Sequence, residues 1–432
     1  MRPATKCPWV KATSGAGPQA PPPDLLGLPA ALSFSISDPR SAPRMQSANS
    51  KIDFLEVRRG NAEDHCGEIA IAEKDFWSTP FQWPSWLRAW QHYLGGQADA
   101  NPFTAIGYCA GQPVFILPLA VSKRLGAQVL TSRGYQQSDY TAPIVGKLHL
   151  DSFAHADGAS ILREIAGRIG NIDLIYLPKQ PSVLEDVANP FVLADAVPYH
   201  AGAHAIDFVA GETWEQSLQR RRSSKTRRRL KEKRAALAKL GQVSFRIAKN
   251  EAEARNLVGI CLRAKTEQLM KLGHWDPFSP PGVRDFLTDY FSANVTQSSW
   301  AVSLDVDGRP VVTAFGFRDS EQWLLYQMAM SGGPESRHSP GTHLLMNLMQ
   351  HCIEQGVSRL DLGLGDESYK AEWCDEDIAL QISAIGLTAR GKLLKKGLML
   401  RARLRARMAA DPRLYERAKW LKGIARKCRL PV

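Results

Sequence analysis

A strand–turn–strand–strand pattern occurs twice in the chain, and this repeat constrains the fold more than any other feature. Residues 102–133 read "PFTAIGYCAGQPVFILPLAVSKRLGAQVLTSR", and residues 300–331 read "WAVSLDVDGRPVVTAFGFRDSEQWLLYQMAMS". The Asp307-Gly308 pair suits the positive backbone dihedrals of a two-residue hairpin turn, and "AGQPV" stands at the same place in the first copy. We therefore expect two copies of one structural plan.

The segments around the two meanders extend this plan. A helix-length segment and a short apolar strand follow each meander, "IDLIYLP" at 172–178 and "SRLDLGLG" at 358–365. Each copy then ends in further strand-like residues, "AIDFV" and "ALQISAIGL", and each is preceded by helical patterns. This order predicts an α+β protein with two domains, residues 51–210 and 211–390, each a mostly antiparallel mixed sheet with flanking helices.

The two ends of the chain differ from the rest in composition. Residues 1–50 are rich in Pro, Ala, Ser and Gly and have no steady period, which predicts a disordered segment, and Met45 is an alternative start. Residues 391–432 carry fourteen Lys and Arg against two acidic residues, and residues 220–234 carry ten against one. The rest of the 432-residue chain therefore has a net charge of −9, a distribution unlike a surface made for nucleic acid.

Several classes of protein are excluded by the sequence. No stretch approaches the ~18 uninterrupted apolar residues of a membrane-spanning helix. The seven cysteines are scattered and contain no C-x-x-C pair, which argues against a disulfide framework or a zinc site and favours a cytoplasmic protein. No histidine has ligand-like spacing to a cysteine or carboxylate, so we expect no metal.

A helix with an anion site at its start is predicted within residues 337–356, "RHSPGTHLLMNLMQHCIEQG". Ser339 suits the N-cap, Pro340 the first helical position and Gly356 the end. The N–H groups of Gly341 and Thr342 would face outward at the positive end of the helix dipole. An ordinary capped helix explains the same residues.

The stretch "LDLGLGDESYKAEW", residues 360–373, ends a strand with two glycines and is not a dinucleotide fingerprint, because the third glycine is missing. If residues 367–373 form a helical turn, Asp366 becomes an N-cap candidate, and Tyr369 and Trp373 share one face. One interpretation is purely structural, with a cap, a surface lysine and two core aromatic residues. The other interpretation places Lys370 as a cation at a reaction centre, with Asp366 as a base or substrate anchor.

The order of strands, glycine-containing loop, helix and strand resembles the GNAT acyltransferase fold. The run from "YQMAMS" to "YKAEW" is similar to the CelD-like branch of cellulose and exopolysaccharide acetyltransferases, and more remotely to the FemAB peptidyltransferases. The resemblance covers roughly residues 52–390, and its most specific parts are S-P-G-T at 339–342 and the G-D-x-x-Y-K-x-x-W run. It departs from the usual R/Q-x-x-G-x-G/A signature after Arg337, because Pro340 replaces the first glycine.

The resemblance implies roles for individual residues. Acetyl-CoA or another acyl-CoA would be the donor, and no metal is implied. Its contacts would be Gln327, Met328, Arg337, Ser339, Pro340, Gly341 and Thr342. The catalytic candidates are Lys370, Asp366, Tyr369 and Tyr326, and the acceptor contacts are Asp139, Tyr140 and Trp373. Backbone N–H groups near Gln327 and Met328 would polarise the thioester carbonyl, and Tyr326 or Tyr369 would protonate the leaving thiolate.

The sequence therefore predicts a cytoplasmic acyl-CoA-dependent N-acyltransferase acting on an amino sugar or similar amine, free or lipid-linked, in polysaccharide or cell-envelope biosynthesis. The alternatives are a FemAB-like transferase that uses aminoacyl-tRNA, which the basic segment 220–234 would suit, and a non-catalytic adaptor that binds membranes or polyanions. In the tail, Leu393, Gly397, Leu400, Leu404 and Met408 form one stripe among arginines. This stripe predicts a helix that lies on an anionic membrane surface or docks on the protein.

Overall fold

The computed structural model describes residues 52–60, 75–96, 98, 100–365 and 367–410. The predictions for residues 1–50 and Met45, for Asp366 and for the tail beyond residue 410 lie outside the described residues. By their contacts, the described residues all belong to one unit, residues 49–432. No helix in the described part of the chain is long and apolar enough to cross a membrane.

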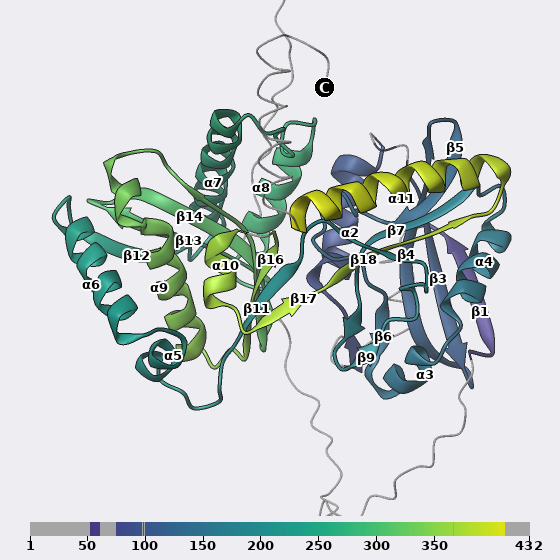
Figure 1. The fold of residues 1–432 in the computed structure, drawn as a ribbon, viewed down its shortest axis with the longest axis horizontal. Helices are drawn as coiled ribbons and strands as arrows, with labels where there is room; N and C mark the ends of the chain where they lie inside the picture. Colours follow the sequence, from purple (N-terminus) through teal and green to yellow (C-terminus); the bar gives the residue numbers. More distant parts are fainter. Residues whose placement is uncertain (1–51, 61–74, 97, 99, 366, 411–432) are drawn as a thin grey trace, which may run out of the picture. The chain divides into compact units, whose positions relative to one another are not determined.

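The first half of the chain forms a mixed sheet in the order β1-β3-β4-β5-β7-β18-β10, with β2 and β6 attached through β4 (Figure 1). The strands in this half of the chain, not all of which belong to this sheet, are β1 (Phe54–Arg59), β2 (Phe76–Trp77), β3 (Asn101–Cys109), β4 (Gln112–Arg124), β5 (Ala127–Ser132), β6 (Ile144–Gly146), β7 (Leu174–Pro181), the separate hairpin β8 (Val183–Leu184) and β9 (Val187–Ala188), β10 (Val197–Pro198) and β11 (Ala203–Asp207). Its helices are α2 (Pro84–Trp90), α3 (Leu150–Ala154) and α4 (Gly158–Ile169).

The second half forms a sheet in the order β12-β13-β14-β15-β16-β11-β17. The strands in this half of the chain are β12 (Val243–Ile247), β13 (Ser299–Val306), β14 (Arg309–Arg318), β15 (Gln322–Met330), β16 (Arg359–Leu364), β17 (Glu376–Ile378) and β18 (Leu380–Gly386), of which β18 joins the first sheet. Its helices are α5 (Trp214–Arg221), α6 (Ser224–Ala238), α7 (Glu251–Leu272), α8 (Val283–Ala293), α9 (Pro340–Glu354), α10 (Ser368–Trp373) and α11 (Ala389–Ala410).

The repeat predicted from the sequence is confirmed. β3, β4 and β5 form an antiparallel meander, α4 follows, and β7 returns parallel to β5. β13, β14, β15, α9 and β16 repeat the same arrangement. The turn after the first strand of each meander uses two successive positive φ angles, at Ala110-Gly111 and at Asp307-Gly308, which is the geometry that matches the twist of a hairpin.

The final strand of each half lies in the sheet of the other half. β11 pairs with β16 and β17, and β18 pairs antiparallel with β7. The sequence pattern predicted these strands as the ends of their own copies, and the sheet order corrects this prediction. Apolar strands of similar length carry no local signal that selects the partner, because a strand is specified by its long-range cross-strand contacts.

Helices cover both faces of the second sheet. Alternate residues of β13, which point to opposite faces, belong to different cores: Ala301 packs with α7 and α8, whereas Trp300 and Val302 pack with α9. The core on the α7 side also contains Trp86 of α2, whose ring lies 4.6 Å from that of Phe286 and 5.1 Å from that of Phe317 between centroids. Helix α2, which comes from the first half of the chain, therefore packs against the second half.

Candidate active site

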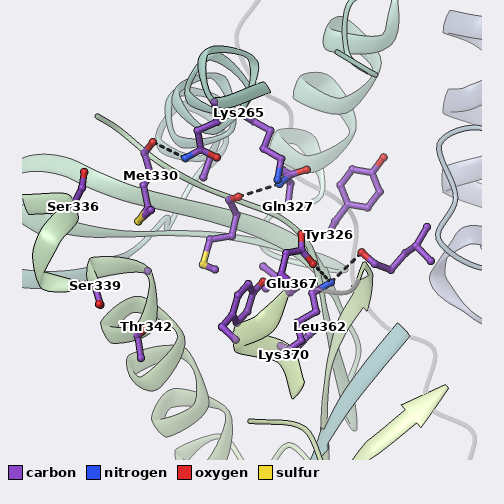
Figure 2. A pocket seen from close by; sticks show the side chains of 17 residues that line it. Lys265, Tyr326, Gln327, Met330, Ser336, Ser339, Thr342, Leu362, Glu367 and Lys370 are labelled. Atoms are coloured by element: carbon purple, nitrogen blue, oxygen red, sulfur yellow. Dashed lines mark hydrogen bonds and ion pairs between the residues drawn. The ribbon is translucent and has the colours of Figure 1, made fainter. Parts of the chain in front are cut away.

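A cavity of about 380 Å³ lies where β15 and β16 part. The two strands pair in parallel only from Gln322 to Leu324 on β15 and from Arg359 to Asp361 on β16. Beyond these pairs, residues 325–330 of β15 form one wall of the cavity, and Leu362 and Leu364 of β16 line the other (Figure 2). A register shift between β14 and β15 occurs at Tyr326, so a bulge stands at the point where the strands separate.

The end of β16 is held by charged side chains. Gly363 has φ +67°, a conformation that favours glycine, and a Cβ there would stand 2.6 Å from the Asp139 Oδ2 and 2.9 Å from the carbonyl oxygen of Leu325. Its N–H donates to the Asp361 Oδ1 (2.7 Å), and the Leu364 N–H donates to the Asp139 Oδ2 (3.1 Å). The glycine therefore makes room for a carboxylate that fixes the strand end.

Lys370 of α10 completes this arrangement. Its Nζ donates to the carbonyl oxygens of Gly363 (3.1 Å) and Leu364 (3.0 Å) and forms an ion pair with the Glu367 Oε2 (3.0 Å). These three contacts match the three N–H donors of an ammonium group. Lys370 is buried but still lines the cavity, so it combines a structural role with a positive charge at the cavity wall.

The first half supplies the support beneath β16. The Tyr140 hydroxyl donates to the Asp361 Oδ2 at 2.6 Å, and the Lys179 Nζ donates to the carbonyl oxygens of Tyr135 (3.0 Å) and Ser138 (2.6 Å). Burial raises the pKa of the Asp139 carboxyl to about 6, opposed mainly by Lys179. Asp139 and Tyr140, predicted as acceptor contacts, therefore contact the backbone and side chain of β16 and do not line the cavity.

At the other end of the cavity stands the N-terminus of α9. The helix begins at Pro340, and its stripe of Leu344, Leu345, Leu348, Met349 and Cys352 is buried, as the apolar spacing predicts. Ser339 occupies the N-cap position with φ +55° and makes no capping hydrogen bond; its Oγ instead lies 2.6 Å from the Lys233 Nζ of α6.

The cavity lining includes Ser339, Gly341 and Thr342, but neither Pro340 nor Arg337. The Thr342 N–H donates to the Ser339 carbonyl oxygen within the first turn (3.1 Å). The expectation that both N–H groups face an anion is therefore corrected for Thr342, and Gly341 remains the candidate donor. Figure 2 shows Ser339 and Thr342 on one side of the cavity and Glu367 and Lys370 on the other.

Both candidate tyrosines line the cavity, but the surroundings of their hydroxyl groups differ. The Tyr326 hydroxyl donates to the Gln137 carbonyl oxygen at 3.0 Å, and its ring packs among Phe81, Phe291 and Phe317. Tyr369 lines the cavity from α10. Burial, together with the nearby Glu367 carboxylate, raises the pKa of Tyr369, so its hydroxyl keeps its proton at neutral pH.

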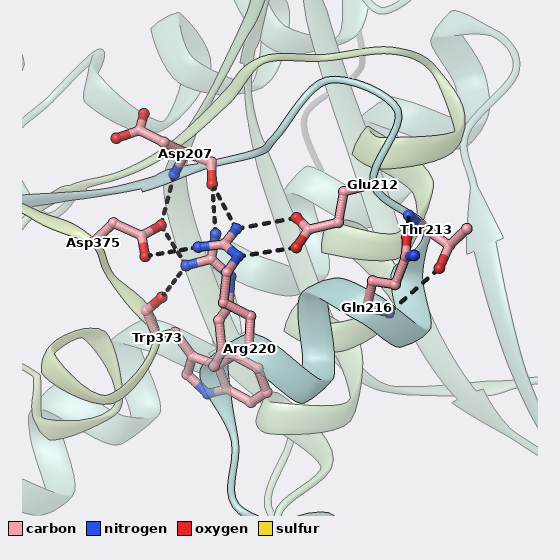
Figure 3. Close-up of polar contacts among 8 residues, drawn as sticks. Asp207, Glu212, Thr213, Gln216, Arg220, Trp373 and Asp375 are labelled. Atoms are coloured by element: carbon pink, nitrogen blue, oxygen red, sulfur yellow. Dashed lines mark hydrogen bonds and ion pairs between the residues drawn. The ribbon is translucent and has the colours of Figure 1, made fainter.

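Trp373 lies in the core and not on the cavity, which corrects its prediction as an acceptor contact. Its side chain is 2% exposed, and the Arg222 guanidinium stacks over its ring at 3.9 Å from the centroid. Arg221 links the chain after α10 to β11, because it donates both to Asp375 and to the Asp207 carbonyl oxygen (2.5 Å). Arg220 pairs with Glu212, which precedes α5 (2.9 Å; Figure 3). Three arginines of the basic segment 220–234 are therefore structural.

The sequence did not single out four polar residues that line the cavity, Lys265, Gln268, Ser336 and Glu367. Lys265 and Gln268 are one turn apart on α7, just after the buried Cys261 and Leu262, and the Gln268 side chain donates to the Met330 carbonyl oxygen at 2.9 Å. Lys265 and Gln268 continue a face of α7 that is otherwise apolar and buried, and this interruption is the sequence signal that could have identified them. Glu367 is the one carboxylate among the described residues that line the cavity.

Comparison with known proteins identifies the type of fold. Residues 224–371 match the family model described as an acetyltransferase (GNAT) domain. The crystal structure of FemX is similar over 79% of this chain and 99% of that chain, with 8% sequence identity and a TM-score of 0.51. No curated protein matches the chain in sequence.

Two further solved structures share the arrangement more loosely. A tandem GNAT protein from the clavulanic acid biosynthesis pathway has 14% identity and a TM-score of 0.40 over 78% of this chain and 100% of its own. L-PGS from Bacillus licheniformis has 15% identity and a TM-score of 0.41 over 75% of this chain and 96% of its own. Within the chain itself, both halves share one plan of strands and helix, as the sequence predicts, and the family model matches part of the second half.

Proposed function

We propose that the protein is an acyltransferase that moves an acyl group, most simply acetyl, from acyl-CoA to an amine in the cavity between β15 and β16. The separation of these strands carries the proposal. Past Leu324, β15 has no strand partner on the β16 side among the residues that the structure describes, so a ligand in the cavity can take the place of a strand there. An extended acyl-pantetheine arm fits such an edge, because its amide groups can form hydrogen bonds with a strand backbone.

The donor's diphosphate would bind at the start of α9. Gly341 offers a backbone N–H at the positive end of a 15-residue helix, and Lys233 stands beside it through its contact with Ser339. From this point residues 325–330 lead along the cavity wall to Tyr326 and the bulge. In this proposal the N–H groups near Gln327 and Met328 polarise the thioester carbonyl.

The chemistry takes place at the end formed by α10. The amine nitrogen attacks the thioester carbon, the C–N bond forms, the C–S bond breaks, and the amine loses one proton. Tyr369 keeps its proton and stabilises the leaving thiolate with a hydrogen bond, and Glu367 lines the cavity to receive the proton from the amine. Lys370 holds Glu367 and the end of β16 in position, and Asp366 remains a proposed contact of the acceptor.

The acceptor is proposed to be an amino sugar or similar amine used in polysaccharide or cell-envelope biosynthesis. This part rests on the resemblance of the S-P-G-T and G-D-x-x-Y-K-x-x-W runs to the CelD-like branch. In this proposal the amine binds beside Glu367, which also pairs with Lys370, and loses its proton there.

Donor binding is tested with a matched pair of variants. Acetyl-CoA should raise the melting temperature of the wild-type chain, and Gly341→Glu should abolish this rise, because it places a carboxylate at the anion site. Gly167→Glu is the control, since that helical glycine in α4 has no atom within 4 Å of a Cβ position. Equal stabilisation of all three proteins by acetyl-CoA would refute the donor site.

Turnover is tested by thiol release with a panel of amino sugars and amino acids. Tyr369→Phe should lower kcat by about 10- to 100-fold with little change in KM, as expected for a lost transition-state hydrogen bond. Tyr326→Phe is the comparison, because its hydroxyl is engaged by Gln137, and it should affect stability more than kcat. The reverse result would assign the leaving-group role to Tyr326.

A FemAB-like transferase that uses aminoacyl-tRNA is the second candidate, and the surface of α6 favours it. This helix exposes Lys225, Arg228, Arg229 and Lys231 to solvent, and it reaches the cavity rim through Lys233. Stabilisation by tRNA but not by acetyl-CoA would select this candidate. Stabilisation by neither ligand would favour the non-catalytic adaptor.

A further inference from the structure

Helix α11 is fixed on the first sheet by one of its faces. Met399 is buried in a cluster with Val129, Leu174 and Ile382, and Leu394, Leu398 and Ala402 pack around it. The Lys395 Nζ forms an ion pair with the Asp195 Oδ2 (2.7 Å), and the Arg390 Nη1 donates to the Gly126 carbonyl oxygen (2.8 Å). Figure 1 shows the helix, in yellow, lying along this sheet. The rotation of α11 about its axis is therefore set.

The predicted apolar stripe of this helix faces away from the protein. Leu393, Leu400 and Leu404 are 73%, 59% and 50% exposed. At about 100° per residue, these three side chains fall within about 40° of one another, and Leu400 lies about 100° from the buried Met399. The helix therefore has two apolar faces, one docked and one open to solvent.

Positive charge surrounds the open leucines. Among residues 389–410 the chain has eight Lys and Arg and no Asp or Glu. Six of them are exposed and are not needed for docking: Lys392, Lys396, Arg401, Arg403, Arg405 and Arg407. On a helical projection these residues flank the leucine stripe on both sides. A leucine stripe between two basic margins is the pattern of a helix that lies in the interface of an anionic bilayer.

A fourth exposed leucine lies beside the start of α11. Leu125, in the turn between β4 and β5, is 86% exposed and has φ +49°. The bond from Arg390 to Gly126 places this turn beside the first turn of the helix. Lys123, next to the turn, is also exposed. The surface formed by Leu125, Leu393, Leu400, Leu404 and the basic residues around them is called the leucine–arginine face below.

We propose that the leucine–arginine face binds an anionic phospholipid bilayer, with α11 parallel to the membrane plane. The basic residues contact the lipid phosphates, and the leucines enter the boundary between headgroups and acyl chains. Nucleic acid offers the same phosphates but no apolar layer for three leucines on one helix. Charge complementarity combined with the leucine stripe therefore favours a lipid surface. This inference does not depend on the acyltransferase proposal.

The test is co-sedimentation of the full chain with vesicles, either phosphatidylcholine alone or an equal mixture of phosphatidylcholine and phosphatidylglycerol. We expect binding to the mixture only, reduced by added salt. Combining Leu393→Ser, Leu400→Ser and Leu404→Ser should lower the affinity for mixed vesicles by about tenfold or more. Leu148→Ser is the matched control, because that leucine is 94% exposed outside this face. Circular dichroism melting checks that the triple variant is folded.

Three outcomes would overturn the proposal. Equal binding to both kinds of vesicle would show that the basic residues do not recognise anionic lipid. Unchanged vesicle binding by the triple variant would show that the three leucines do not contribute to binding. A concentration-dependent dimer in analytical ultracentrifugation, lost in the triple variant and seen without vesicle binding, would assign the face to a second copy of the chain.

Discussion

Replacing Gly363 with alanine tests whether the kink at the end of β16 is rigid. The φ of +67° costs an alanine about 1–2 kcal/mol. The new Cβ would also stand 2.6 Å from the Asp139 Oδ2 and 2.9 Å from the Leu325 carbonyl oxygen. Relief requires Asp139 to move and to lose its hydrogen bond to the Leu364 N–H, which adds about 1.5–3 kcal/mol. We expect Gly363→Ala to lower the free energy of unfolding by about 3–5 kcal/mol.

Urea denaturation followed by circular dichroism measures this loss, and Gly356→Ala is the control. Gly356 has nearly the same φ, +72°, but a Cβ there meets no atom within 4 Å, so this variant should lose only about 1–2 kcal/mol. Equal losses at the two glycines would refute the argument, because the contact with Asp139 would then cost nothing. When Asp139 is already replaced by serine, Gly363→Ala should lower the free energy of unfolding by less. A double-mutant cycle over the two positions then measures the coupling energy between the new Cβ and Asp139.

Three further predictions concern stability. Burial, followed by Arg234 and Lys233, lowers the pKa of His343 to about 4, so the native state favours the neutral ring. The wild type should therefore lose about 3 kcal/mol relative to His343→Gln as the pH falls from 6.5 to about 4, measured by urea titration at each pH. Arg222→Ala, which removes the stack on Trp373, should cost about 1–2 kcal/mol, whereas Arg228→Ala, in an exposed pair, should cost under about 0.5 kcal/mol. Residues 211–410 expressed alone lack β11 and should aggregate; a cooperative native-like melt of that fragment would contradict the strand exchange.

Local chemistry made part of the fold predictable from the sequence. The Asp307-Gly308 turn follows from the positive φ angles that Asp and Gly tolerate, and α9 follows from its apolar spacing and from Pro340 and Gly356. The exchange of β11 and β18 was not predictable, because both strands are short and apolar and either sheet could accept them. The same limit applies to α11, whose sequence carries two apolar stripes. Only the sheet surface that receives Met399 decides which stripe is buried.

For the candidate site, the sequence indicated that residues 360–373 matter but did not predict which residues they contact. "LDLGLGDESYK" drew attention to Gly363 and Lys370; in the structure Lys370 lines the cavity with Glu367 and donates a hydrogen bond to the Gly363 carbonyl oxygen. That Asp139 reaches the Leu364 N–H depends on a contact 225 residues apart in the chain. Such a contact has no periodic signal, because it follows from how the halves of the chain pack.

The strand exchange explains why the first half matters to a cavity that it does not line. The lining residues of the described chain all fall within residues 265–370. Yet β11 pairs with one edge of β16, and the Asp139 carboxylate lies beside Gly363 and accepts a hydrogen bond from the Leu364 N–H. The Gly365 N–H also donates to the Gly202 carbonyl oxygen at 2.9 Å. The edge of β16 that turns away from β15 is thus occupied by the first half. A separated β16 would lose these contacts, and the cavity beside β15 would lose its fixed opposite wall. The two halves of the chain therefore build one candidate site, in which the first half positions β16 and the second half supplies the residues that line the cavity.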